Sequence, residues 1–203
     1  MQHPARCRSL EEFILKKTNI RAFGSITVTA AMKTIFAIIG SASQDSSNHQ
    51  VLRHLQHKLS PEVHLTVFDR LKELPHFDPE ESRSQPPIEI IALRQVIQDA
   101  DLVLISSPEY IFSIPSGLKN LLEWCAATTV FTDKPVSIIT AAAQGETGHA
   151  ELQRIMQGLG AHLHAESNLL IQGVKGKLDT AGNIWDQQLD IQLDQLAEYL
   201  KSS

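Results

Sequence analysis

The chain has 203 residues, 42% of them apolar and 20% charged, which is typical of one globular domain with a substantial core and excludes a wholly disordered chain. Its 18 basic and 23 acidic residues are interspersed and give a formal net charge of −5, so the chain offers no basic surface for nucleic acid. The apolar runs are too short for a membrane span, and the two cysteines, Cys7 and Cys125, favour a reducing, cytoplasmic compartment over a disulfide framework or a zinc site.

Residues 1–31 differ from the rest of the chain in having weak hydrophobic periodicity and several basic side chains. Glu11 and Glu12 argue against a transit peptide, and no continuous apolar segment supports a secretory signal. We expect a poorly ordered N-terminal extension over residues 1–31, with Met32 as a possible working start, followed by one domain over residues 32–203.

From Met32 onward, short apolar runs alternate with helical stripes. The first run, residues 35–39, is apolar at every position, as is typical of a parallel strand buried on both faces. Strands are predicted at 35–39, 63–68, 101–105, 136–140 and 169–171. Helices are predicted from apolar stripes at 51–59, 93–100, 118–125, 152–159 and 189–200. A proline-rich loop through Pro75, Pro79 and Pro86 separates the second strand from the second helix.

This alternation predicts an α/β fold with a doubly wound, five-stranded parallel sheet, because right-handed crossovers place helices on both faces in a three-layer αβα arrangement. The common order for five such strands is 2-1-3-4-5. Its switch point lies between the first and third strands, and ligands bind outside the carboxyl ends of the strands there. We therefore expect the loops at 40–48, 107–114 and 141–147 to meet in one crevice.

The first of these loops, residues 40–48, offers hydroxyls, an amide and the N-terminus of a helix. Neutral donors and the helix dipole together can hold a phosphate, so a nucleotide monophosphate fits this loop. A capping box formed by Ser47 and Gln50 explains the same residues without a ligand. The patterns G-x-G-x-x-G, G-x-x-x-x-G-K-[ST] and G-x-S-x-G are absent, which disfavours a Rossmann dinucleotide site, a P-loop and a serine hydrolase.

The second loop lies between two prolines and carries two aromatic side chains. Pro108 shapes the loop and Pro115 starts the next helix. Tyr110 and Phe112 can border a planar heterocycle, or they can be core or interface residues. The third loop has small side chains and glycine, which let backbone approach a ligand closely, but it can also be a plain strand-to-helix turn capped by Thr147.

Two segments resemble the NADPH-dependent FMN reductase family, flavodoxin-like flavoproteins that include quinone, azo-dye and chromate reductases. The family pattern after the first strand is G-S-x-R-x-x-S-x-N, matched here by Gly40, Ser41, Ser46 and Asn48. The pattern after the third strand is P-E-Y-N-x-S-[IV]-P-x-x-L-K-N-x-[ILV]-[DE]-W, matched by Pro108, Glu109, Tyr110, Ser113, Ile114, Pro115, Leu118, Lys119, Asn120, Glu123 and Trp124. The resemblance runs in topology from Met32 to the C-terminus and implies a flavodoxin-like fold.

The resemblance also implies an FMN site built from the three loops. Ser41, Ser46 and Asn48 would bind the FMN phosphate, and residues 108–111 would form a backbone wall beside the isoalloxazine ring. Gln144 and Gly145 would approach the pyrimidine side of that ring. The full set of candidate cofactor-binding residues is Ser41, Ser43, Ser46, Ser47, Asn48, Pro108, Glu109, Tyr110, Ile111, Ser113, Gln144 and Gly145. No catalytic side chain or metal ligand is expected, and Glu109 is expected to accept backbone or interface hydrogen bonds.

Two positions depart from the family pattern. Ser43 stands at the family arginine, and Ile111 stands at the asparagine after Pro-Glu-Tyr. With Asp45 nearby, the first change removes positive charge where a phosphate dianion would bind. We therefore expect weaker FMN retention than is usual in the family.

The activity implied by the resemblance is that of an NAD(P)H-dependent flavin oxidoreductase. Electrons would pass from NADPH or NADH through FMN, with ping-pong kinetics, to a small acceptor such as a quinone, an azo compound, a metal oxyanion or free flavin. A homodimer or homotetramer is expected, because Trp124 lies off the main apolar stripe of its helix and because a dimer completes the flavin pocket in this family. Two alternatives stay open, a flavodoxin-type electron carrier and a flavin-free regulatory or scaffold domain.

Overall fold

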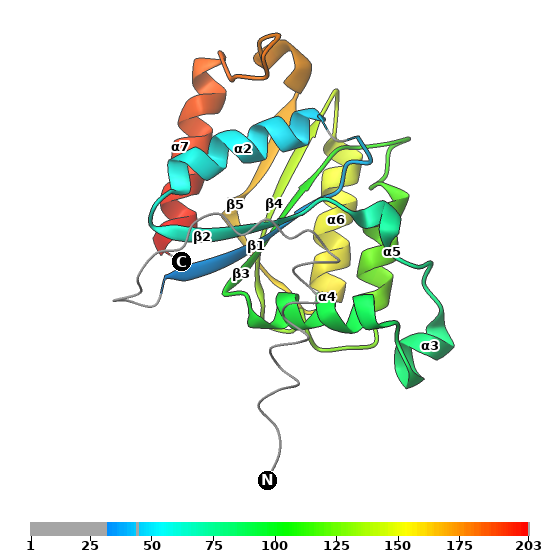
Figure 1. Cartoon of the computed structure of the whole chain (residues 1–203). Helices are drawn as coiled ribbons and strands as arrows, with labels where there is room; N and C mark the ends of the chain where they lie inside the picture. The colour runs from blue at the N-terminus through cyan, green and yellow to red at the C-terminus, as the bar shows by residue number, and fades with distance from the viewer. Residues whose placement is uncertain (1–31, 44, 203) are drawn as a thin grey trace.

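A five-stranded parallel sheet in the order β2-β1-β3-β4-β5 forms the centre of the protein (Figure 1). The computed structural model describes residues 32–43 and 45–202. Its strands are β1 (Lys33–Ile39), β2 (Val63–Phe68), β3 (Leu102–Ser107), β4 (Pro135–Ala142) and β5 (His162–Gln172). The predicted strand order is confirmed, whereas the prediction for residues 1–31 lies outside the described residues.

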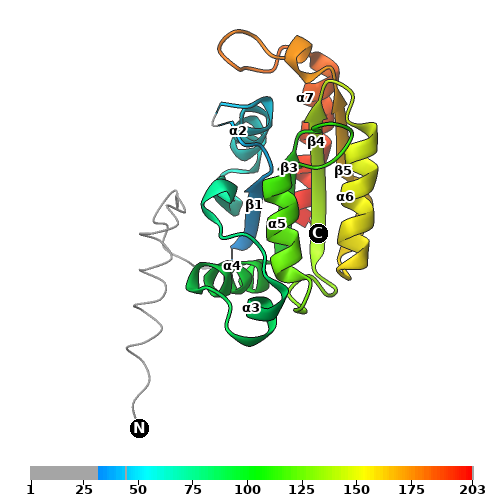
Figure 2. The same ribbon diagram turned by 90° about the vertical axis from the view of Figure 1, so that its right-hand side faces the viewer.

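Helices cover both faces of the sheet, as the turned view in Figure 2 shows. One face carries α2 (Ser47–Leu59) and α7 (Gln187–Ser202). The other carries α4 (Ile88–Asp99), α5 (Ser116–Cys125) and α6 (Glu146–Gly158). This arrangement confirms the three-layer αβα prediction and the flavodoxin-like fold.

Alternate residues of each central strand enter opposite halves of the core. On β1, Ile35 and Ile39 pack with α2 and α7, while Phe36 and Ile38 pack with the helices of the other face. A strand that is buried on both sides needs apolar residues at nearly every position, because its side chains alternate between the two faces. The continuous apolar runs in the sequence therefore have a direct structural cause.

The proline-rich segment after β2 contains more regular structure than predicted. It forms the 3-10 helix η1 (Leu71–Glu73) and the short helix α3 (Pro79–Ser84). Asp78 caps α3 by accepting hydrogen bonds from the N–H groups of Glu80 and Glu81, and Pro79 occupies the first helical position. Proline there gives up an N–H that the helix would not use, so the prolines start a helix here as well as bounding a loop.

Two predicted helix starts are wrong by one or two residues. The cap of α2 is Ser46, whose Oγ accepts from the His49 N–H, so the capping box with Ser47 as cap is incorrect. Helix α6 begins at Glu146, after Gly145 at φ 91°, so Thr147 is not its cap. In both helices the cap is an earlier residue than predicted, Ser46 for α2 and Gly145 for α6, and its backbone is not helical.

The argument for an oligomer interface at Trp124 is also overturned. Its side chain is 0% exposed, its indole N–H donates to the Pro75 carbonyl at 2.9 Å, and the Phe77 ring packs edge-on against it at 5.4 Å. The second apolar face of α5 is therefore covered by the proline-rich segment of the same chain. Across the described residues, no helix is both long and apolar enough to cross a bilayer.

Candidate functional site

The three predicted loops meet at the carboxyl edge of the sheet. We call them loop 1 (residues 40–43, 45 and 46), loop 2 (residues 108–115) and loop 3 (residues 143–145). Loop 1 contacts loop 2 through Ser41 Oγ and Tyr110 Oη, which lie 3.4 Å apart. Gly40 allows the carboxyl ends of β1 and β3 to lie close together, because a Cβ at this position would lie 2.5 Å from Ser107 Oγ. Loop 2 in turn contacts loop 3, because Glu109 accepts from the Gly145 N–H, so the predicted convergence at the switch point is observed.

Serine hydroxyls accept backbone hydrogen bonds at both ends of loop 1. Ser41 is nearly buried, and its Oγ accepts from the Ser43 N–H at 3.2 Å. Ser46 caps α2, and the residues on either side of it, Asp45 and Ser47, are at least partly exposed. The first turn of α2 has no acidic residue, so no carboxylate of that turn competes with a ligand for its N–H groups.

Asn48 connects loop 1 to two strands. Its side-chain amide donates to the Ala141 carbonyl at 3.0 Å, and its Oδ1 accepts from Ser106 Oγ at 3.1 Å. The residue is 1% exposed. In this geometry the side chain fixes the start of α2 against the ends of β3 and β4.

Loop 2 is a tight hairpin, visible in Figure 1 between β3 and α5. Tyr110 and Ser113 exchange both backbone hydrogen bonds, at 2.9 and 3.1 Å. The two residues between them, Ile111 and Phe112, have φ values of 51° and 61°. This is the pattern of a type I′ turn, which favours asparagine and glycine, so Ile111 is out of place in its backbone conformation. The tip is also apolar and open, with Ile111 93% and Phe112 66% exposed.

Two carboxylates fix loop 2 to α6. Glu109 accepts from the N–H groups of Gly145 and Gly148, at 3.2 and 2.7 Å. In the opposite direction, Glu151 of α6 accepts from Ser113 Oγ at 2.7 Å and from the Ile114 N–H at 3.2 Å. The prediction that Glu109 accepts backbone hydrogen bonds is confirmed, and we call the four contacts the carboxylate clamp.

Loop 3 is held by the same clamp. Gly145 adopts φ 91°, a conformation that L side chains rarely reach, and its N–H is already bonded to Glu109. Gln144 is exposed. Beside it, the Gly173 N–H donates to the Ala143 carbonyl at 3.1 Å, which joins loop 3 to the segment after β5.

That segment, residues 173–186, contains the 3-10 helix η2 (Val174–Lys177) and lies beside α2 at the carboxyl edge of the sheet. Gly182 lies against Gln50 of α2, since a Cβ there would be 2.7 Å from its Nε2. Trp185 is 66% exposed on the same segment. The carboxyl edge is thus bordered by four segments, one more than predicted.

Two histidines lie beside the loops. His49 Nδ1 lies 2.9 Å from Ser46 Oγ, and burial lowers the pKa of its imidazole despite the nearby Asp69. His149 Nδ1 lies 2.8 Å from Thr140 Oγ1, and burial lowers its pKa as well. Within the described part of the chain, no group of three histidine, cysteine or acidic residues is placed to hold a metal ion.

Sequence reasoning missed His49, Gly148 and Glu151. His49 occupies the third helical position after its cap, a place where side chains commonly reach back to the cap, so its role was open to prediction. Glu151 carries no such signal, because its partners on loop 2 are distant in sequence and the pairing depends on how α6 packs.

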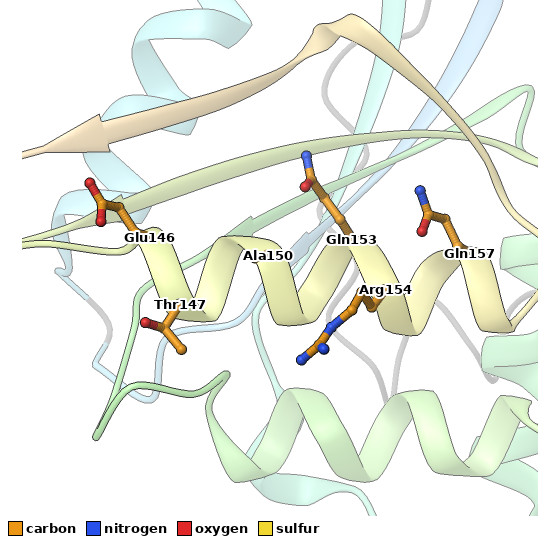
Figure 3. Close-up of a pocket in the computed structure, with 6 residues that line it drawn as sticks. All are labelled: Glu146, Thr147, Ala150, Gln153, Arg154 and Gln157. Atoms are coloured by element: carbon orange, nitrogen blue, oxygen red, sulfur yellow. The ribbon is translucent and has the colours of Figure 1, made fainter.

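A groove of about 530 Å³ runs along the outer flank of α6, apart from the loops (Figure 3). It is lined by Glu146, Thr147, Ala150, Gln153, Arg154 and Gln157. All six lie on one helix, so the groove is an open surface and does not enclose a ligand. It adjoins the loops only at the first turn of α6.

Comparisons with known proteins show the family of the chain. Residues 33–172 match the family described as NADPH-dependent FMN reductase. The chain is 32% identical over 167 residues to the NADH:(hydroxy)cinnamate reductase subunit CrdA of Vibrio ruber, covering 79% of this chain and 81% of that protein. It is 29% identical over 182 residues to the NADPH:quinone oxidoreductase of Arabidopsis thaliana, covering 85% and 92%.

The fold is also that of a solved flavoenzyme. FerB, an NAD(P)H:(acceptor) oxidoreductase from Paracoccus denitrificans, superposes with a TM-score of 0.71 at 22% identity, covering 83% of this chain and 97% of FerB. The family match spans more than half of the chain and includes loops 1, 2 and 3. The chain therefore belongs to the NADPH-dependent FMN reductase family and is an NAD(P)H-dependent flavin oxidoreductase with a flavodoxin-like fold.

Proposed function

We propose that the loops at the carboxyl edge bind FMN and that the protein passes electrons from NADPH or NADH to a small acceptor of the quinone type. The observation that carries the proposal is the contact between Ser41 Oγ and Tyr110 Oη at the switch point. This contact brings a serine hydroxyl of loop 1 next to the aromatic hairpin of loop 2, which supports a phosphate site beside a site for a flat ring. The printed activity of one relative, an NADPH:quinone oxidoreductase, supports a quinone as acceptor.

The FMN phosphate would lie at the N-terminus of α2. Ser41 and Ser46 offer hydroxyls, and Ser47 and Asn48 offer backbone N–H groups that the helix itself leaves unused. The helix dipole adds to their attraction for an anion. The Asn48 side chain would act by holding these donors in place, since its amide already joins two strands. With Ser43 in place of an arginine, the donor set is neutral, so FMN retention would be weak.

The isoalloxazine ring would lie against residues 108–111, with Gln144 and Gly145 towards its pyrimidine side. The carboxylate clamp would hold this wall in position, because Glu109 and Ser113 are both bonded to α6. Ile111 and Phe112 at the open hairpin tip would border the place where the acceptor enters.

Bound FMN would supply the hydride and electron transfer chemistry. The residues of the chain would bind and orient the cofactor and exclude water from one side of it. No side chain is needed as a general acid or base. Glu109 in particular is not free for such a role, because both of its carboxylate oxygens accept from the backbone of loop 3 and α6.

A homodimer or homotetramer in the cytoplasm completes the proposal. The described cysteine, Cys125, is a buried thiol, which fits a reducing compartment. The open tip of loop 2 leaves apolar surface at the edge of the site that a second subunit would cover.

The test is to load the full chain with FMN and add NADPH or NADH without oxygen. Loss of the flavin absorbance, followed by its return when a quinone is added, is the expected result. A flavin band that persists with both nucleotides would indicate an electron carrier instead. A chain that binds no FMN at any concentration tried would indicate the scaffold alternative.

A further inference from the structure

The hydroxyl of Ser46 lies between two groups of His49. Its Oγ accepts from the His49 backbone N–H at 3.4 Å and lies 2.9 Å from His49 Nδ1. The other ring nitrogen, Nε2, is buried without a hydrogen-bond partner among the described residues, and the Asp69 carboxylate lies 3.6 Å from it. A serine hydroxyl has one hydrogen and two lone pairs, so these contacts determine where its hydrogen can point.

When His49 is neutral, its single ring hydrogen belongs on Nε2, because the Asp69 carboxylate faces that atom and would repel a lone pair. Nδ1 is then an acceptor and takes the hydrogen of Ser46 Oγ. The hydroxyl has no hydrogen left for a ligand. A phosphate at the N-terminus of α2 would meet a lone pair of Ser46 instead of a donor.

When His49 is protonated, both ring nitrogens are donors. Nδ1 then donates to Ser46 Oγ, and the backbone N–H of His49 fills the second lone pair. The hydroxyl hydrogen must point away from His49. The same protonation places a positive charge one turn from the loop in which Ser43 stands at the arginine of the family pattern.

We propose that His49 is a positioning residue for FMN, which when protonated turns the Ser46 hydroxyl into a donor to the FMN phosphate and supplies the charge that loop 1 lacks. This inference rests on the proposed binding of FMN. On this proposal, the affinity of the protein for FMN increases as the pH falls, because the His49 imidazole gains a proton without touching the flavin ring.

Charged groups from three segments act on His49. Asp69 after β2 and Asp45 in loop 1 favour its protonation, whereas Arg53 on α2 opposes it. Burial is the largest influence and holds the pKa of His49 below its ordinary value in the free protein. A bound phosphate dianion would add a negative charge and raise that pKa, so binding of FMN and binding of a proton would assist each other.

The test compares His49→Gln with the unchanged chain. Glutamine at this position keeps a Ser-x-x-Gln capping box with Ser46, so α2 retains its cap without a titratable ring. His57→Gln, at an exposed site near the other end of α2, is the matched control. FMN dissociation constants are measured at about pH 8 and about pH 6. The FMN phosphate itself is protonated with a pKa of about 6, and this effect cancels when the dissociation constants of two proteins are divided at each pH.

The unchanged chain is expected to gain roughly fivefold in FMN affinity relative to His49→Gln between the two pH values, within the tenfold per pH unit that one linked proton allows. His57→Gln should follow the unchanged chain. A ratio that does not depend on pH overturns the inference while leaving the proposed function in place. Absence of FMN binding in all three proteins overturns both.

A second measurement needs no flavin. Nitrogen-15 NMR of the imidazole in the free protein distinguishes the two neutral tautomers. The expected form carries its hydrogen on Nε2, with Nδ1 as the acceptor from Ser46. The opposite tautomer would overturn the inference whatever the FMN affinities show.

Discussion

The Glu109 carboxylate accepts a 2.7 Å hydrogen bond from the backbone N–H of Gly148, in the first turn of α6. A negative charge at this end of a helix is favourable because the first N–H groups have no partner within the helix. The contact joins loop 2 to α6 and fixes the wall that the proposed flavin would face.

Replacing Glu109 by glutamine should weaken the carboxylate clamp. The N–H groups of Gly145 and Gly148 donate to different oxygens of Glu109, and in glutamine one of these oxygens becomes an N–H₂ group that faces an N–H donor. We expect a loss of about 1 to 2 kcal/mol in the free energy of unfolding, measured with urea. Glu146→Gln, in the same helical turn, controls for the helix dipole and should cost about 0.5 kcal/mol or less. Equal losses for both variants would argue against the clamp.

Gly148→Ala should disturb loop 2 from the other side. Its Cβ would lie 3.2 Å from Glu109 Cγ and 3.3 Å from the Ser113 carbonyl oxygen, so the hairpin would have to shift. We expect both lower stability and weaker FMN binding. Gly158→Ala on the same helix meets nothing within 4 Å and should be neutral or stabilising by up to about 1 kcal/mol. If the two alanine variants behave alike, the close approach at Gly148 is not important.

Ile111→Asn should stabilise the protein. Ile111 has φ 51°, which is costly for a β-branched side chain and tolerated by asparagine, and its side chain is open to solvent. We expect a gain of about 1 kcal/mol and a higher melting temperature. Ile91→Asn, at a partly exposed helical position of α4, controls for removal of apolar surface and should be mildly destabilising. A loss of stability in Ile111→Asn would show that the isoleucine packs against something in solution.

Asp101→Asn should reveal a pH-dependent link between β1 and β3. Hydrogen bonds from the Thr34 N–H and Oγ1 to the carboxylate, both 2.7 Å, hold the pKa of Asp101 below its ordinary value. Because the folded pKa is the lower one, the stabilisation is complete above the unfolded pKa of about 3.9 and is lost as the pH falls through the folded value.

For this exposed group we expect a difference of about 1 kcal/mol between the unchanged chain and Asp101→Asn from neutral pH down to about pH 5, and a smaller one in stronger acid. Unfolding by urea across this pH range gives the measurement. Asp99→Asn, whose carboxylate accepts from the Gln95 side chain in the neighbouring helical turn, serves as the control. A difference that widens as the pH falls would contradict the assigned direction.

The sheet could be predicted from the sequence because its strands are buried on both faces. Apolar runs such as residues 35–39 are typical of parallel strands buried on both faces, and 2-1-3-4-5 is a common order for five such strands in a doubly wound sheet. The first part of β5 was not predicted as strand. His162 and His164 lie there in an exposed part of an edge strand and carry no apolar signal.

The candidate site was predictable in its loops but not in its side-chain contacts. The motif residues placed Ser41 and Tyr110 on neighbouring loops, and the structure brings their oxygens together. The partners of Ser113 and His49 depend instead on how α6 and β2 pack against the sheet, so Glu151 and Asp69 could not be assigned from spacing along the chain.

The two tryptophans of the chain lie in opposite environments. Trp124 is enclosed in the core, whereas Trp185 lies open to water beside the carboxyl edge. We therefore expect the emission of the buried Trp124 to respond to unfolding, and that of the exposed Trp185 to respond to the proposed flavin at this edge. If the flavin binds there, folding and cofactor binding could both be followed by intrinsic fluorescence, without a label.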